Sequence, residues 1–178
     1  MKVQSPHKYA RIERERRFLL GQFPNNVTVT RVRHIIDRYI GGTALRLRKQ
    51  SEEGGPTLCK LTQKIPARSG GAQQGLITTM YLTEDEYGVL AQLSAKTLCK
   101  TRHSVPPLGI DVFEGELNGL VLAEAEFDSA GAADAFTIPS FVSREVSTDD
   151  RFTGGQLVRA SPQDIRSWLL EYGIGLWA

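Results

Sequence analysis

The stretch Arg11–Leu20, with the sequence Arg-Ile-Glu-Arg-Glu-Arg-Arg-Phe-Leu-Leu, decides the fold because it alternates with the period of a β-strand. Successive side chains of a strand point to opposite faces, so Glu13, Glu15 and Arg17 share one face. Burying unpaired charge in an apolar core is costly. This charged column is therefore expected either on the solvated face of a sheet or on the lining of a polar interior.

Several later stretches repeat the alternation of charged and apolar residues. The other charged columns are Arg46 and Arg48, Lys60 and Lys64, Lys100 and Arg102, and Glu124 and Glu126. The opposite faces carry Ile12, Phe18, Leu45, Leu47, Leu61 and Ala125. The recurrence of one pattern along the whole chain favours a shared environment for the charged side chains.

The remaining elements follow from turn and capping signals. Strands are expected at 27–40 (one bent strand or two short ones), 43–49, 57–64, 76–82, 97–103, 108–114, 120–127 and 142–147. Helices are expected at 83–95, 129–136 and 162–172, the first with a capping box and the last with Ser161-Pro162 at its start. Hairpin order predicts an antiparallel sheet, and the charged columns predict that it closes. We therefore expect a mainly β (α+β) fold: one domain, 1–178, forming an eight-stranded antiparallel barrel with helices packed outside.

Composition narrows the class of protein. The 178 residues carry a net charge of only +2, which gives no reason to expect nucleic-acid binding. Two cysteines, Cys59 and Cys99, have neither metal-ligand nor disulfide spacing, and we expect a reduced, cytoplasmic protein. Met1–Ala10 lacks the apolar run of a signal peptide, and no stretch is long enough to span a membrane.

An inward orientation of the charged columns makes the interior an anion site. Seven bases and four acids leave the inferred interior with a net charge of +3. Arginine and lysine from several strands surround a multiply charged phosphate well, and the clustered carboxylates suit Mg²⁺ or Mn²⁺. The alternative is an open sheet on which these charges pair as surface ladders.

Read in order, the motifs resemble those of the CYTH superfamily, the triphosphate tunnel metalloenzymes. Glu13-Arg14-Glu15-Arg16-Arg17 is similar to the Glu-x-Glu-x-Lys signature of that superfamily. The later motifs are Leu45-Arg46-Leu47-Arg48, Leu61-Thr62-Gln63-Lys64, Lys100-Thr101-Arg102, Ile110–Gly115 and Leu122–Phe127. The resemblance covers most of the chain and implies a tunnel that binds triphosphates with Mg²⁺ or Mn²⁺ and cleaves them.

The resemblance also implies roles for individual residues. Carried over by motif, the metal side consists of Glu13, Glu15, Glu124 and Glu126, and the phosphate side of Arg17, Arg46, Arg48, Lys60, Lys64, Lys100 and Arg102. The residues expected to take part in catalysis are Glu13, Glu15, Arg17 and Glu126. Two departures stand out: Arg17 replaces the titratable signature lysine, and the strand Leu76–Leu82 is neutral where many relatives place charges.

The expected activity is metal-dependent hydrolysis of a triphosphate, either inorganic tripolyphosphate or an organic triphosphate. The alternatives are an adenylate cyclase that makes cyclic AMP from ATP in the same kind of tunnel, and a non-catalytic polyphosphate-binding module. The expected partner is a small triphosphate compound, with no nucleic acid and no membrane. The sequence leaves the oligomeric state open, a homodimer included.

Other residues have competing interpretations. The three histidines, His7, His34 and His103, lack ligand spacing, and a surface or tunnel-rim position is expected for them. Asp111 and Arg144 are either tunnel residues or structural ion pairs, and 149–151 is either a solvated turn or a contact at the tunnel mouth. Trp168 and Trp177 are expected to pack against the barrel exterior.

Overall fold

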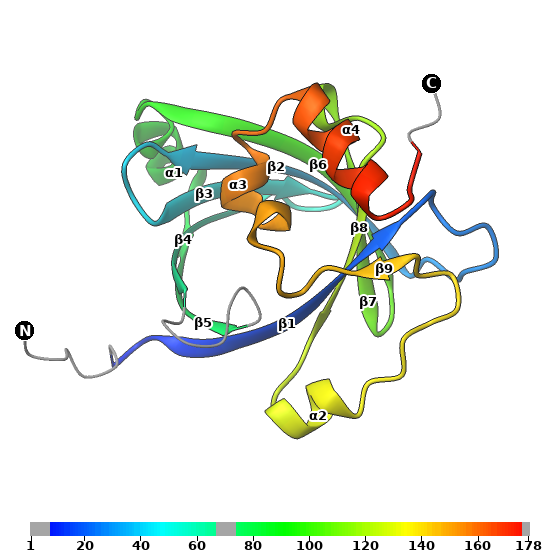
Figure 1. Cartoon of the computed structure of the whole chain (residues 1–178). Coiled ribbons are helices and arrows are strands. Elements are labelled where there is room, and N and C mark those ends of the chain that lie inside the picture. The colour runs from blue at the N-terminus through cyan, green and yellow to red at the C-terminus, as the bar shows by residue number, and fades with distance from the viewer. Residues whose placement is uncertain (1–7, 67–73, 176–178) are drawn as a thin grey trace, which may run out of the picture.

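The chain folds around a closed antiparallel barrel (Figure 1). The structure is a computed structural model that describes residues 8–66 and 74–175. The barrel strands are β1 (Arg11–Leu20), β2 (Arg31–Ile40), β3 (Leu45–Ser51), β4 (Leu58–Pro66), β5 (Gln74–Leu82), β6 (Ala95–Val105), β7 (Leu108–Phe113) and β8 (Val121–Glu126). A two-residue strand, β9 (Arg144–Glu145), pairs with β1 at Phe18 and Leu19. No helix in the described part of the chain is long and apolar enough to cross a membrane.

The first strand closes the barrel. The strand order is β5-β4-β3-β2-β6-β7-β8-β1, and β1 also pairs with β5. Its first half, Arg11–Arg14, lies against β5, and its second half, Glu15–Leu20, lies against β8. Because closure gives the sheet an inside, the charged columns line a common interior, as the sequence predicted, and the alternative of surface ladders on an open sheet is wrong.

The helices lie outside the strands or at one end of this barrel (Figure 1). They are α1 (Glu84–Leu90), α2 (Ala130–Asp134), α3 (Gly154–Leu157) and α4 (Pro162–Glu171), with 3₁₀ turns η2 (Gly115–Leu117) and η3 (Asp150–Phe152). Both predicted capping motifs are present: Thr83 caps α1 with Glu86, and Ser161 caps α4 with Asp164.

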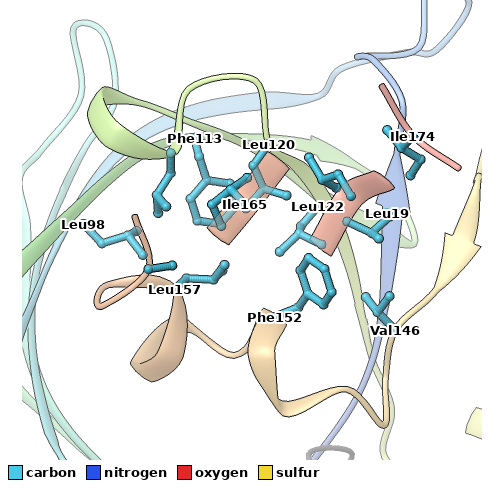
Figure 2. Packing of buried hydrophobic residues seen from close by; sticks show 13 residues of the cluster. Leu19, Leu98, Phe113, Leu120, Leu122, Val146, Phe152, Leu157, Ile165 and Ile174 are labelled. Atoms are coloured by element: carbon cyan, nitrogen blue, oxygen red, sulfur yellow. The ribbon is translucent and has the colours of Figure 1, made fainter. Parts of the chain in front are cut away.

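One end of the barrel interior is apolar and filled. Inward-facing Leu19, Leu98 and Leu122 meet Phe152 and Leu157, which come from η3 and α3 (Figure 2). Side chains of α4 complete this cluster, including Ile165 and Leu169, and Trp168 packs edge-on against Phe152 with ring centroids 6.1 Å apart. Trp168 therefore helps to close the end of the barrel, whereas Trp177 lies outside the described residues.

A second apolar cluster lies on the outer side of β1, β7 and β8. It contains Phe18, Ile110, Ala123 and Ala125, with Val27 and Val29 packed against it. This packing explains why the β-branched residues at 27–30 are not strand, contrary to the prediction of strand over 27–40. Ile12, also expected under a covering element, is 51% exposed.

The predicted helix over 83–95 is too long, because α1 ends at Leu90. The guanidinium of Arg38, on the neighbouring β2, donates to the carbonyl oxygens of Ala91 and Leu93 at 2.9 and 3.2 Å. These bonds satisfy carbonyls that another helical turn would have used, and β6 begins at Ala95. The helix boundary is thus set by a residue 53 positions away in the chain.

Candidate functional site

The barrel encloses a cavity of about 710 Å³. All of the charged residues predicted to face inward line it: Glu13, Glu15, Arg17, Arg46, Arg48, Lys60, Lys64, Lys100, Arg102, Glu124 and Glu126. Among the described residues, eleven basic and five acidic side chains line the cavity, so its lining carries a net positive charge. Their placement in one cavity is confirmed, and their individual roles stay predictions.

The acids are concentrated on β1 and β8, and we call Glu13, Glu15, Glu124 and Glu126 the acidic wall. The register puts Glu15 directly opposite Glu126, and Arg17 opposite Glu124. Each wall carboxylate except the exposed Glu126 contacts a base. The pairs are Glu13 with Lys64 at 2.7 Å, Glu15 with Arg17 at 3.1 Å, and Glu124 with Arg102.

Repulsion within the acidic wall is concentrated on Glu15. Burial and the negative charge of Glu124 raise the pKa of Glu15 to about 7, although Lys64 and Arg17 oppose the shift. Glu13 adds to the repulsion. The pKa of Glu124 is well below its ordinary value despite burial, because Arg102 and Lys100 face it. One carboxylate of the wall is thus held near its titration point at neutral pH.

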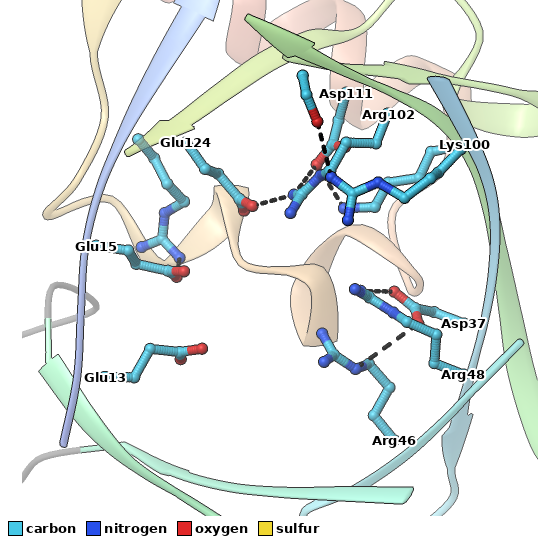
Figure 3. A network of polar contacts seen from close by, with 12 residues as sticks. Glu13, Glu15, Asp37, Arg46, Arg48, Lys100, Arg102, Asp111 and Glu124 are labelled. Carbon is cyan, nitrogen blue, oxygen red and sulfur yellow. Dashed lines mark hydrogen bonds and ion pairs between the residues drawn. The ribbon is translucent and has the colours of Figure 1, made fainter. Parts of the chain in front are cut away.

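The opposite side of the cavity is basic, as Figure 3 shows for Arg46 and Arg48. We call Arg33, Arg46, Arg48 and Lys60, from β2, β3 and β4, the basic wall. Its arginines meet one buried acid, Asp37, which accepts two hydrogen bonds from Arg48 at 2.6 Å each and lies 3.7 Å from Arg46. Although burial favours the neutral carboxyl, Arg46 and Arg48 hold the pKa of Asp37 well below its ordinary value.

Two arginines of the basic wall have side-chain N–H groups that lack a hydrogen-bond acceptor among the described residues. The Nε atoms of Arg33 and Arg46 are buried and form no hydrogen bond with any residue that the structure describes, although Arg46 Nε lies 3.7 Å from Asp37. A buried donor without an acceptor costs free energy. The basic wall is therefore arranged to donate hydrogen bonds from its side chains to an anion that enters the cavity.

A second buried acid supports the bases of β6. Asp111 on β7 accepts hydrogen bonds from Lys100 at 2.5 Å and from Arg102 at 2.6 Å through each oxygen. It is fully buried, so of the two interpretations of Asp111, the structure supports the ion pair. Arg144 is exposed on β9, where it donates to the carbonyl oxygen of Ser143, and it does not line the cavity.

Sequence reasoning missed several residues that line or support the cavity. Asp37 and Tyr39 lie on β2, whose expected pattern was obscured by the apolar pair Ile35-Ile36. Burial, followed by the charge of Asp37, raises the pKa of Tyr39 to about 12. The alternation Arg33, Ile35, Asp37, Tyr39 was the available signal, because it continues the inward face of a strand.

The segment of η3 and α3 is the largest addition to the site. Asp150, Phe152 and residues 153–159 line the cavity, and Gly154 lies so close to the Tyr39 hydroxyl that an added Cβ would be 2.0 Å from it. Asp149 binds Arg151 at 2.7 Å and accepts a hydrogen bond from Tyr172 at 2.8 Å, so 149–151 is not a solvated turn. This segment connects the tunnel end to α4.

The neutral strand forms the remaining side of the cavity. Ile77, Thr79 and Tyr81 of β5 face inward, and Thr79 forms a hydrogen bond with Thr62 of β4 at 3.2 Å. The side of the cavity formed by β5, between the basic and acidic walls, thus presents hydroxyl groups and no charged side chain among the described residues.

Neither histidine that the structure describes lines the cavity. His34 is exposed and contacts the Thr101 hydroxyl, and His103 packs on the ring of Phe23 at 4.6 Å. His7 lies outside the described residues. Within 8–66 and 74–175, no group of three or more histidine, cysteine, aspartate or glutamate side chains is arranged to hold a metal ion.

No protein-family model matches the chain. An inorganic triphosphatase of Nitrosomonas europaea is 31% identical over 157 residues, which cover 84% of this chain and 99% of the relative. The crystal structure of the inorganic triphosphatase NE1496 matches with a TM-score of 0.54 at 25% identity, over 84% of this chain and 96% of that one. Another crystal structure, of the hypothetical protein NE1496, matches with a TM-score of 0.55 at 27% identity, over 84% and 99%.

Proposed function

Because the chain belongs to the CYTH superfamily, together with the inorganic triphosphatase it resembles over most of its length, we propose that it hydrolyses a triphosphate inside the barrel. We propose inorganic tripolyphosphate as the substrate. The observation that carries the proposal is the charge of the cavity, which eleven basic and only five acidic residues of the described chain line.

Charge favours a triphosphate over a single phosphate. A phosphate monoester brings about −1.5 to −2 at neutral pH and would leave most of the bases facing one another. Like charges repel more strongly in a cavity of reduced dielectric than in water. A triphosphate brings more negative charge along a chain, so several strands contact it at once.

The basic wall is proposed to hold the phosphate chain. Arg46 and Arg48 have a fixed fork of donors that matches phosphate oxygens, and Asp37 orients Arg48 from behind. Lys100 and Arg102 are oriented by Asp111 in the same way. Positioning of this kind supplies much of the rate in phosphoryl transfer, where little covalent chemistry is asked of the protein.

The acidic wall is proposed to hold Mg²⁺ or Mn²⁺. Its donors fit such an ion, because Mg²⁺ takes one or two carboxylates together with waters and phosphate oxygens. Burial and the charge of Glu124 raise the pKa of Glu15 to about 7, and a cation held by one or two carboxylates of this wall would reduce that repulsion. A bound divalent ion neutralises developing charge and lowers the pKa of a coordinated water. We also propose a cytoplasmic location, since both cysteines are free.

A panel of substrates against metals tests the proposal. Tripolyphosphate, ATP, pyrophosphate and p-nitrophenyl phosphate are each assayed with Mg²⁺, Mn²⁺, Ca²⁺ or excess chelator, and phosphate release is measured. We expect fast release from tripolyphosphate with Mg²⁺ or Mn²⁺ and none with chelator. Full activity in chelator contradicts the metal proposal.

The same panel separates the alternatives. Cyclic AMP and pyrophosphate from ATP would identify a cyclase. Tight binding of tripolyphosphate without turnover under any metal would identify a binding module. Faster turnover of ATP than of tripolyphosphate would replace the proposed substrate by an organic triphosphate.

A further inference from the structure

Lys60 is a lysine of the cavity whose neighbours are mainly cationic. It projects from β4, directly opposite Arg48 on β3 and Tyr81 on β5. In the described part of the chain it makes no ion pair with a carboxylate, since none of the described salt bridges includes it. It is half-buried in the basic wall rather than exposed at the rim.

The other lysines of the cavity differ from Lys60. Lys64 lies 2.7 Å from Glu13, and Lys100 lies 2.5 Å from Asp111. Lys96 is exposed, so water solvates its charge. Among the lysines that line the cavity, Lys60 therefore combines partial burial with the lack of a direct carboxylate partner.

The groups around Lys60 are mainly cationic. Those facing it from the packed strands are Asp37 on β2, Arg46 and Arg48 on β3, Tyr81 on β5 and Arg102 on β6. Asp37 is already bound to Arg48 through both oxygens. Burial, followed by the charges of Arg48 and Arg46, lowers the pKa of Lys60 to about 8.

We propose that Lys60 determines the charge selectivity of the tunnel: it is partly deprotonated in the free cavity and takes up a proton when a polyanion binds. A triphosphate beside Lys60 reverses the local sign of the potential, which favours the ammonium form. For its ligand, this inference rests on the proposed function.

Because proton uptake by Lys60 is coupled to anion binding, the affinity for the anion depends on pH in a defined direction. Because the bound form holds the extra proton, affinity is highest below pH 8 and falls as the pH rises through 8, by up to tenfold per pH unit. A monophosphate brings less charge and shifts the proton less. The preference for triphosphate over orthophosphate therefore decreases as the pH rises.

The titration of Lys60 is measured first in the free protein. Acetylation with trace acetic anhydride, followed by peptide mass spectrometry across pH 6–11, gives the pKa of each lysine from its labelling rate. We expect Lys60 to titrate near 8, well below the ordinary value of about 10.4 for a lysine. A Lys60 that titrates near that ordinary value overturns the inference, whatever the protein binds.

Proton uptake is measured next by calorimetry. Metal-free protein is titrated at pH 8 with metal-free tripolyphosphate, in two buffers of different ionisation enthalpy. We expect the wild type to take up about half a proton more than Lys60→Arg, which keeps the charge but does not titrate. The matched control, Lys49→Arg, changes a lysine of β3 that lies outside the cavity beside Glu84, and this variant should take up as many protons as the wild type.

The outcomes keep this inference apart from the proposed function. Equal proton uptake by wild type and Lys60→Arg overturns the role of Lys60, even if tripolyphosphate binds tightly. Wild type that fails to bind tripolyphosphate overturns the proposed substrate, and the labelling experiment still decides on Lys60. Should Lys60→Arg not fold, Lys60→Gln gives the same comparison, with weaker binding expected for the loss of charge.

Discussion

The acidic wall and the basic wall of the tunnel are built from strands with the same alternating pattern. They differ in how completely their charges are paired. Both are built from charged side chains at alternate positions, on β1 and β8 or on β2, β3 and β4. In the basic wall one buried carboxylate, Asp37, serves two arginines and its charge is fully compensated. In the acidic wall Glu13, Glu15 and Glu124 each contact a base. Burial and the charges of the other two glutamates nevertheless raise the pKa of Glu15 to about 7.

The two walls differ in whether their charged groups are already satisfied within the protein. A paired charge supports the fold, whereas an unsatisfied group is a candidate for ligand binding. Asp37 is paired with ideal geometry and its charge supports the fold. Glu15 and the Nε of Arg46, which forms no hydrogen bond among the described residues, are left in states that cost free energy without a ligand. Perturbed groups of this kind gather at functional sites. The two walls thus predict opposite effects when their charges are removed.

The largest effect is expected in the basic wall. Asp37→Asn leaves Arg48 and Arg46 buried without a counter-charge, and breaking a buried pair in this way costs about 3–5 kcal/mol. Urea unfolding at pH 7 measures the loss. The control Asp85→Asn, at an exposed position on α1, should change stability by less than about 1 kcal/mol. Similar small losses in both variants would show that Asp37 is not the support of this wall.

The next effect concerns the acidic wall. Glu15→Gln removes the carboxylate proposed to hold the metal, and we expect kcat to fall at least a hundredfold, or roughly 3 kcal/mol in the barrier. The exposed Glu126→Gln, opposite it in the register, is expected to have a smaller effect. Steady-state kinetics with tripolyphosphate and Mg²⁺ measure both, and an unchanged kcat in Glu15→Gln contradicts the role of this wall.

Glu15→Gln should also change how the stability of the protein depends on pH. The folded-state pKa of Glu15 lies above its ordinary value of 4.5, so its favourable contribution is complete below about pH 4.5 and is lost as the pH rises through 7. Thermal unfolding of the wild type should therefore become easier from pH 5 to pH 8, and the slope should be shallower in Glu15→Gln. Parallel curves for the two proteins would mean that Glu15 is ionised throughout this range.

A smaller effect is expected for Arg46, whose Nε lies 3.7 Å from Asp37 and forms no hydrogen bond among the described residues. Arg46→Ala removes a charge-assisted hydrogen bond to phosphate, which is worth about 1.5–3 kcal/mol, and so weakens tripolyphosphate binding about ten- to a hundredfold. The loss should be larger at low salt, because screening already attenuates the attraction at high salt. Calorimetric titration measures the affinity. Arg144→Ala, on β9 and outside the cavity, is the matched control, and an equal loss there would point to bulk charge.

The smallest effect tests the end of the tunnel, where the walls meet η3 and α3. Gly154→Ala forces the Tyr39 hydroxyl aside, at a cost of about 1–3 kcal/mol for overpacking. Gly155→Ala has no atom within 4 Å of its new methyl group and should be neutral or stabilising. Thermal unfolding of the pair measures the difference. If both variants unfold together with the wild type, Gly154 and Tyr39 do not pack as closely as described.

Prediction from sequence succeeded best on the strands that alternate strictly. For β1, β3, β4, β6 and β8 the columns of charge identified the inner face, and all of them line the cavity. It failed where another part of the chain decides the outcome. Arg38 ends α1 by binding its last carbonyls, and packing against the outer cluster keeps 27–30 out of the sheet.

The sequence by itself determined which side chains share a face, because the backbone of a strand sends neighbouring side chains to opposite sides whatever it pairs with. Only the tertiary structure decided which charges meet. Closure of the barrel brings Glu15 to Glu126, and it places η3 and α3 across one end. Electrostatic energy depends on distance in space and on burial, and neither is encoded in the spacing of residues along the chain.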